Sequence, residues 1–289
     1  MEDSFLTQLH ACTLSAKEVL FTDELKTKLE EKGDRAAENA LHVTVFSFTY
    51  RSLGNVIAGF AILPKASASK LPVIMYNRGG NKDFGLIKQG MLFLHIAELA
   101  RWGYMVIGSQ YPGNSVSEGH DHFGGYTDIQ SILDLHSILE QLSLADTSRI
   151  GMFGGSRGGM MTYLCLTKVA WIRCAASIAG ASNLVRQSTL RPAMQEVFTD
   201  TFGGDEEGKK QRSAVYWPEK FPDNAPILLM HGTADWRVSP LDSIDLAAKL
   251  YEHKKPFSLM IYDGGDHGLT QYEKEWQTLA KEWLDNHLK

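Results

Sequence analysis

Residues Arg149 to Met161 read R-I-G-M-F-G-G-S-R-G-G-M-M, and the predicted fold follows from them. The apolar residues between Ile150 and Phe153 are typical of a buried strand, and Met160 to Val169 is predicted to be a helix. Between the two, glycines surround Ser156 in the pattern G-x-S-x-G, which is typical of a nucleophile elbow. Glycine is needed there because the turn crowds its neighbours and strains the serine backbone. We therefore expect a nucleophilic serine on a sharp strand-to-helix turn.

Strands and helices are predicted to alternate on both sides of this turn. Two β-rich runs between Leu41 and Leu63 form a hairpin around Ser52 to Asn55. Besides the elbow strand, the remaining strands are predicted at Pro72 to Asn77, Tyr104 to Ser109, Cys174 to Ala179, Pro226 to Met230 and Phe257 to Tyr262. Apolar residues at helical spacing predict helices that contain Leu92 to Leu99, Ile129 to Leu139, Pro240 to Glu252 and Tyr272 to Leu288. This alternation predicts an α/β protein with a mostly parallel, eight-stranded sheet covered by helices on both faces.

The domain organisation is expected to be simple. Residues 1–40 form an N-terminal extension, and residues 41–289 form one catalytic domain with an irregular insert at about 181–224. In the extension, Thr22 is predicted to start a helix that ends at Gly33.

Composition excludes several classes of function. The 289 residues are 44% hydrophobic and carry a net charge of −5, which gives no general attraction for nucleic acid or an anionic membrane. The three cysteines, Cys12, Cys165 and Cys174, lack metal-ligand spacing, so reduced thiols are expected, with no metal and no cofactor. No basic and apolar leader is present at the N-terminus, and no run reaches the ~18 apolar residues of a membrane span. A cytoplasmic location is therefore expected.

Two later motifs supply partners for Ser156. Asp235 lies in H-G-T-A-D-W-R-V-S-P after the strand that ends at Met230, and His267 lies in Y-D-G-G-D-H-G-L after the strand that ends at Tyr262. A serine becomes a good nucleophile when a neutral imidazole takes its proton and a carboxylate orients that imidazole. Serine, acid and histidine in this order after successive strands predict a catalytic triad. Weaker candidates for the acid are Asp242, Asp245, Asp263 and Asp266.

Three blocks of the sequence, G-G-S-R-G-G, H-G-T-A-D-W-R-V-S-P and G-D-H-G, resemble the catalytic domain of the prolyl oligopeptidase family, within the α/β-hydrolase superfamily. The resemblance covers about Leu41 to Leu288 and implies an α/β-hydrolase fold, the triad Ser156, Asp235 and His267, and an acyl-enzyme mechanism. Family peptidases commonly carry a β-propeller before this domain, and the 40 residues that precede it here are too few to build one. Hydrolysis of small esters is therefore as plausible as hydrolysis of short peptides.

An oxyanion hole needs two donors. One is expected to be the backbone N–H of Arg157, and the other a backbone N–H of Gly79 or Gly80, in a loop where relatives have Tyr or His before the glycines. For Arg78 two roles are expected to be equally plausible: it binds a substrate carboxylate, or it makes a surface ion pair.

Other side chains near the expected cleft carry weaker signals. Aromatic candidates for the substrate pocket are Tyr111, Phe198, Phe202, Trp217 and Trp236. His120 and His122 supply too few ligands for a metal, and His231 is expected to support the acid loop. We therefore expect a serine hydrolase, similar to the serine-type peptidases of this family, that cleaves the ester or peptide bond of a small ester or short peptide through an acyl-enzyme. The alternatives are a carboxylesterase and, from another class, a non-catalytic hydrolase-fold binding protein.

Overall fold

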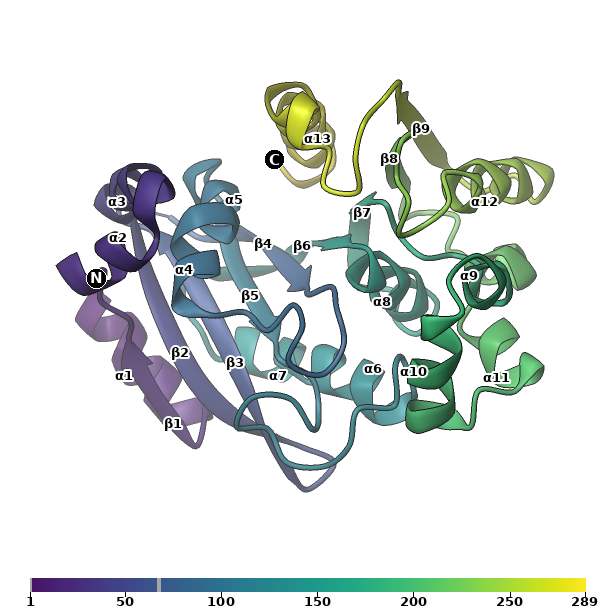
Figure 1. Cartoon of the computed structure of the whole chain (residues 1–289). Helices are drawn as coiled ribbons and strands as arrows, with labels where there is room; N and C mark the ends of the chain where they lie inside the picture. The colour runs from purple at the N-terminus through teal and green to yellow at the C-terminus, as the bar shows by residue number, and fades with distance from the viewer. Residues whose placement is uncertain (1, 67–68) are drawn as a thin grey trace.

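A computed structural model describes residues 2–66 and 69–289 of the chain. Within these residues nine strands form one sheet, in the order β1-β2-β3-β5-β4-β6-β7-β8-β9 (Figure 1). The strands are β1 (Ser15–Glu18), β2 (Val43–Ser52), β3 (Asn55–Pro64), β4 (Leu71–Asn77), β5 (Met105–Ser109), β6 (Ala145–Gly155), β7 (Ile172–Ile178), β8 (Ile227–Gly232) and β9 (Phe257–Tyr262). The six strands β5, β4, β6, β7, β8 and β9 are parallel to one another. The strands β1, β2 and β3 pair antiparallel, and β3 also pairs antiparallel with β5. The predicted mostly parallel sheet is confirmed.

The ninth strand is the difference from the predicted eight. β1 pairs antiparallel with the outer side of β2, with Ala16 opposite Phe48. Its four residues, S-A-K-E, bury only Ala16, so they show no run of alternating apolar residues. A short edge strand of this kind is made by backbone pairing, which leaves little trace in the sequence.

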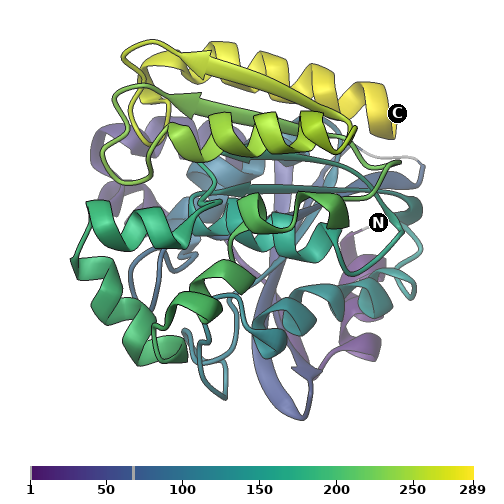
Figure 2. The same ribbon diagram turned by 90° about the vertical axis from the view of Figure 1, so that its right-hand side faces the viewer.

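Helices cover both faces of the sheet (Figures 1 and 2). Neighbouring strand residues point to opposite faces, since Met152 packs in one apolar core and Phe153 in the other. The first core is closed by α1 (Glu2–Cys12), α6 (Tyr126–Leu133), α7 (Leu135–Leu139), α8 (Arg157–Leu166) and α12 (Leu241–Glu252). The second is closed by α3 (Gly33–His42), the continuous helix α4 (Gln89–Met91), η2 (Leu92–Ile96) and α5 (Ala97–Arg101), and α13 (Glu273–Leu288). Among the described residues, no helix is both long enough and apolar enough to cross a membrane.

The N-terminal segment contains one correction. Thr22 caps α2 (Asp23–Lys28) as expected, with its hydroxyl oxygen 3.2 Å from the backbone nitrogen of Leu25. After the short turn η1 (Glu30–Lys32), however, Gly33 begins α3 and does not end a helix. A Cβ at Gly33 would lie 2.5 Å from the carbonyl oxygen of Lys26, so glycine is present because α2 and α3 pack closely there.

The segment predicted to be irregular, 181–224, is mostly helical, and that prediction was wrong. It contains α9 (Leu184–Leu190), α10 (Ala193–Phe202), α11 (Glu206–Gln211), η3 (Ala214–Tyr216) and η4 (Pro218–Lys220). Asn183 and Asp205 cap α9 and α11 through their side chains. These helices are too short to show a clear apolar repeat, and they are stabilised by packing. α10 and α11 pack on α9, η3 packs beside α8 and α12, and η4 packs beside α12.

Candidate active site

Ser156 lies on the sharp turn between β6 and α8, with φ +56° and ψ −124°. These angles are strained for a residue with a side chain. The two glycines of the motif are required by close approach. A Cβ at Gly154 would lie 2.3 Å from the carbonyl oxygen of Gly158, and one at Gly158 would lie 2.0 Å from that of Asn77. The predicted turn geometry is therefore present.

Asp235 and His267 meet on the loops that follow β8 and β9. Nδ1 of His267 lies 2.7 Å from Oδ2 of Asp235. Because an ionised carboxylate only accepts hydrogen bonds, the imidazole donates from Nδ1, which leaves Nε2 as the acceptor nitrogen. The other carboxylate oxygen accepts from the backbone N–H of Arg237 at 2.8 Å and of Val238 at 3.1 Å. The carboxylate is therefore held in place independently of the histidine.

A second imidazole, His231, is fully buried behind this carboxylate. Its Nε2 lies 3.1 Å from both Oδ2 of Asp235 and the carbonyl oxygen of Val238, so Nε2 carries the proton. Its Nδ1 lies 2.7 Å from the hydroxyl of Ser243, from which it accepts. Burial alone would raise the pKa of Asp235, but the hydrogen bonds from His231 and His267 outweigh it and hold that pKa well below its ordinary value. His231 supports the acid loop, as expected.

Ser156 and His267 line the same two cavities. Among the described residues no hydrogen bond joins the hydroxyl of Ser156 to the imidazole of His267. Catalytic hydrogen bonds are often long in an empty site and shorten when substrate binds. The two side chains are thus open to one shared space, into which a substrate carbonyl could enter.

The loop after β4 carries the two candidate glycines for the oxyanion hole. A Cβ at Gly79 would lie 3.5 Å from Cβ of Ser156, so this glycine lies directly beside the serine. Gly80 has φ +75° and turns toward Phe84, whose carbonyl oxygen would be 2.1 Å from a Cβ placed there. The N–H of Arg157 is in the first turn of α8 and has no partner within that helix. Gly79 and Arg157 therefore flank Ser156 more closely than Gly80 does.

Arg78 is buried, 1% exposed, so the predicted surface ion pair is wrong. Its Nε donates to the carbonyl oxygen of Gln110 at 3.0 Å, and its Nη1 donates to that of Gly79 at 3.2 Å. The side chain lines neither cavity that contains Ser156, so it does not reach substrate directly. Burial lowers the pKa of Arg78 to about 10, which keeps the guanidinium charged at neutral pH.

The side chain of Arg157 is buried on the other side of the same loop. It makes a bidentate ion pair with Asp121, at 2.7 and 2.5 Å, and a longer one with Asp128, at 3.3 Å. Its Nη1 also donates to the carbonyl oxygen of Gly80 at 3.3 Å. Burial would raise the pKa of Asp121, yet the charge and hydrogen bonds of Arg157 hold it below the ordinary value. The sequence pattern does not predict this ion pair, because Arg157 and Asp121 are 36 residues apart in the chain.

Of the aromatic candidates for the substrate pocket, only Trp236 lines a cavity that contains Ser156. Tyr111 is fully buried between the guanidinium groups of Arg78 and Arg157, each 5.1 Å from its ring centre, and lines neither cavity at Ser156. Its hydroxyl donates to the carbonyl oxygen of Arg78 at 2.9 Å, so it supports the loop. Trp236 is 71% exposed and does line a cavity with Ser156.

Trp217, Phe198 and Phe202 do not reach the serine. Trp217 is buried against Phe221, and its indole nitrogen donates to the carbonyl oxygen of Lys210. Phe198 packs between Phe123 and Phe202. The short helices of the 181–224 segment turn these rings into the first core of the sheet, which the sequence pattern could not predict.

The alternative acids have other contacts. Asp242 accepts from the backbone N–H groups of Ser182 and Asn183, and burial raises its pKa to about 6. The remaining acids bind elsewhere: Asp245 pairs with Arg186, Asp263 accepts from Thr233, and Asp266 accepts from Thr270. In the described part of the chain no cluster of His, Cys, Asp or Glu could hold a metal ion. Of the candidate acids, Asp235 is the one in contact with His267.

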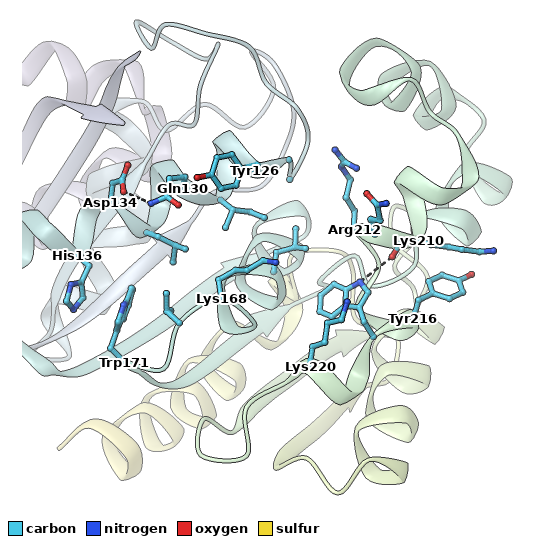
Figure 3. Close-up of a pocket in the computed structure, with 18 of the residues that line it drawn as sticks. Tyr126, Gln130, Asp134, His136, Lys168, Trp171, Lys210, Arg212, Tyr216 and Lys220 are labelled. Atoms are coloured by element: carbon cyan, nitrogen blue, oxygen red, sulfur yellow. Dashed lines mark hydrogen bonds between the residues drawn. The ribbon is translucent and has the colours of Figure 1, made fainter. Parts of the chain in front are cut away.

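Two cavities include Ser156 in their walls, and a third, larger one does not. The first, of about 340 Å³, is lined by Ser156, His267, Arg191 and Arg237, and we call it the arginine cavity. The second, of about 580 Å³, is lined by Ser156, His267, Phe153 and Trp276, and we call it the apolar chamber. A larger hollow of about 1140 Å³ lies elsewhere, between the α6 side of the sheet and Lys210, Tyr216 and Lys220 (Figure 3). It shares no lining residue with the apolar chamber and does not include Ser156.

The family model and the similar proteins point to the same family. A model described as the prolyl oligopeptidase family matches residues 94–289. The uncharacterized peptidase YtmA of Bacillus subtilis is 29% identical over 231 residues, covering 78% of this chain and 87% of the relative. Dipeptidyl peptidase 8 of Mus musculus is 26% identical over 244 residues, covering 78% of this chain and 26% of the relative. The chain thus spans most of the bacterial relative and about a quarter of the mouse one.

Solved structures agree with this. A structure described as acylaminoacyl peptidase in complex with Z-Gly-Gly-Phe-chloromethyl ketone superposes with a TM-score of 0.74 at 25% identity, covering 86% of this chain and 42% of the other. Uncomplexed acylaminoacyl peptidase of Pyrococcus horikoshii gives a TM-score of 0.72 at 25% identity, covering 84% of this chain and 41% of the other. The α/β-hydrolase architecture is therefore shared with structurally characterised peptidases.

Proposed function

The chain belongs to the prolyl oligopeptidase family of hydrolases, and on this premise we propose that Ser156, His267 and Asp235 form its catalytic triad. The observation that carries the proposal is the 2.7 Å contact between His267 and Asp235, at a cavity wall that both His267 and the strained Ser156 share. Residues 41–289 form the catalytic unit in this proposal, and residues 1–40 are an extension packed on it.

The proposed reaction proceeds through an acyl-enzyme. Nε2 of His267 takes the proton of the Ser156 hydroxyl as its oxygen attacks the substrate carbonyl carbon. The imidazolium that forms is stabilised by Asp235, which stays ionised because its pKa is held low. The imidazolium of His267 then passes the proton to the leaving alcohol or amine. In the second half of the reaction His267 takes a proton from water, which attacks the acyl-enzyme, and returns it to the oxygen of Ser156 as the acid is released.

The oxyanion is proposed to bind between the backbone N–H of Arg157 and that of Gly79. This choice within the pair Gly79 or Gly80 is supported by the closeness of Gly79 to Ser156. Donors of this kind act because they are already oriented when negative charge develops on the carbonyl oxygen. Arg78 and Arg157 support the loop through the carbonyl oxygens of Gly79 and Gly80.

Peptide bonds are the favoured substrate within this proposal, and small carboxylic esters are the second candidate. The relatives are named peptidases, and one was solved with a peptide chloromethyl ketone. In the arginine cavity, Oε1 of Gln187 is buried and has no partner among the described residues. A peptide offers N–H groups to this acceptor, whereas a simple ester does not.

A matched panel of substrates tests the proposal. Hydrolysis of aminoacyl p-nitroanilides and of p-nitrophenyl acetate would be measured for the wild type and for Ser156→Ala. We expect the wild type to cleave both, with kcat/KM for the anilides reduced more than for the acetate when Gln187 is changed to Leu. Cleavage of the acetate alone would favour a carboxylesterase. A wild type inactive on both would favour a non-catalytic binding protein.

A further inference from the structure

The apolar chamber and the arginine cavity meet at Ser156 and His267 and share no other lining residue. The chamber lies between the helix from α4 to α5 and helix α13, and an aromatic stack forms its inner wall. Tyr76 and Phe153 are stacked with ring centres 6.2 Å apart, and Phe153 and Trp276 are 6.1 Å apart. Met91 and Leu99 line the facing side. A concave, mainly apolar space of this size next to a reactive serine is typical of a binding site for part of a substrate.

Three of the charged side chains at the chamber are paired. Arg35 of α3 and Glu273 of α13 form an ion pair at 2.8 Å, and Glu98 pairs with Arg101 at 3.7 Å. The Arg35 pair joins the N-terminal extension to the last helix, and both of its residues line the chamber. Lys32 also lines the chamber and forms no ion pair among the described residues. Most of the chamber wall is apolar, so an apolar group fits it better than a charged one.

Resting on the proposed function, we propose that the apolar chamber binds an uncharged alkyl or aryl group attached to the scissile bond. The substrate class is then an ester or amide with one extended apolar side. The arginine cavity, which carries Arg191, Arg237 and the free acceptor of Gln187, takes the other, more polar side.

Two ester series test this. In one, the alcohol of an acetate grows from methyl to hexyl, and in the other the acyl group of a methyl ester grows from acetate to hexanoate. Each methylene that enters an apolar site adds about fourfold in binding. We therefore expect kcat/KM of the wild type to rise at least tenfold along one series, and that series identifies the side of the bond that the chamber holds. If kcat/KM rises in neither series, the proposal is overturned.

Met91→Trp fills the chamber from its half-buried wall, and we expect it to reduce the hexyl-to-methyl ratio of kcat/KM at least fivefold. Met260→Trp is the matched control, because Met260 is 40% exposed on β9 and lines neither cavity. The control should keep the wild-type ratio. Thermal unfolding and labelling of Ser156 by a compact phosphofluoridate establish that both variants are folded and reactive. An unchanged ratio in a labelled Met91→Trp variant overturns the inference alone, whereas a wild type that neither labels nor hydrolyses methyl acetate overturns the proposed function.

Discussion

The two loops that frame Ser156 are held by opposite kinds of electrostatic contact. After β8, hydrogen-bond donors converge on one carboxylate, because Asp235 accepts from two backbone N–H groups, from His231 and from His267. After β4, donors converge on backbone carbonyls, because Arg78 and Arg157 bind the carbonyl oxygens of Gly79 and Gly80. The first arrangement sets the protonation of an imidazole. The second sets the direction of a peptide group, so the two loops should fail in different ways when they are changed.

The largest effect should come from Asp235→Asn. The amide can no longer stabilise the imidazolium, and it favours the wrong tautomer of His267. We expect kcat to fall by about 10⁴-fold with little change in KM. Steady-state kinetics on the better substrate of the panel would measure this. A loss below tenfold would mean that another acid serves His267, and Asp242→Asn is the control that should leave kcat near the wild-type value.

For the loop after β4, which Arg157 supports from the start of α8, Arg157→Met should act first on stability. It leaves the carboxylates of Asp121 and Asp128 buried without their cation, and breaking a buried pair in this way costs about 3–5 kcal/mol. Denaturant unfolding would measure the change. Arg35→Met is the matched control, because its pair with Glu273 is partly exposed and should be worth less than ~1 kcal/mol. Equal losses in the two variants would contradict a special role for the buried pair.

Gly79→Ala should reduce activity with a smaller effect on stability. The new methyl group would lie 3.0 Å from the carbonyl oxygen of Gly155 and 3.5 Å from Cβ of Ser156, so the loop must shift by a few tenths of an ångström. Loss of one well-placed oxyanion donor costs about 10²–10³-fold, and a small shift should cost about tenfold to 10²-fold in kcat. Single-turnover acylation rates would show this. An unchanged acylation rate would argue against the Gly79 N–H as the second donor.

The smallest effect is a pH dependence of stability at Asp235. Its folded pKa is depressed, so the carboxylate contributes stability above its unfolded pKa of about 3.9, and this stability is lost as the pH falls. The difference in unfolding free energy between the wild type and Asp235→Asn should therefore shrink by about 1 kcal/mol from pH 5 to pH 3. Urea unfolding at both values would measure it. A difference that grows toward pH 3 would reverse the sign of the pKa shift.

The comparison also shows what the sequence could predict. The strands β6 and β8 contain buried apolar runs, and β9 is an apolar run at the edge of the sheet. The positions of Ser156, Asp235 and His267 just after these strands were therefore predictable from pattern alone. The surroundings of Arg78, Tyr111 and Trp217 were not, because their burial depends on how irregular loops and short helices pack. The same is true of β1, whose backbone pairing leaves little pattern in its side chains.

Labelling with a fluorophosphonate, followed by mass spectrometry of the digested protein, tests the central proposal most directly. We expect the wild type to form one covalent adduct on the peptide that contains Ser156, and we expect Ser156→Ala to form none. Asp235→Asn should label far more slowly at the same residue. A wild-type protein that is folded but does not label, or a Ser156→Ala variant that labels as fast as the wild type, would contradict the assignment of Ser156 as the nucleophile.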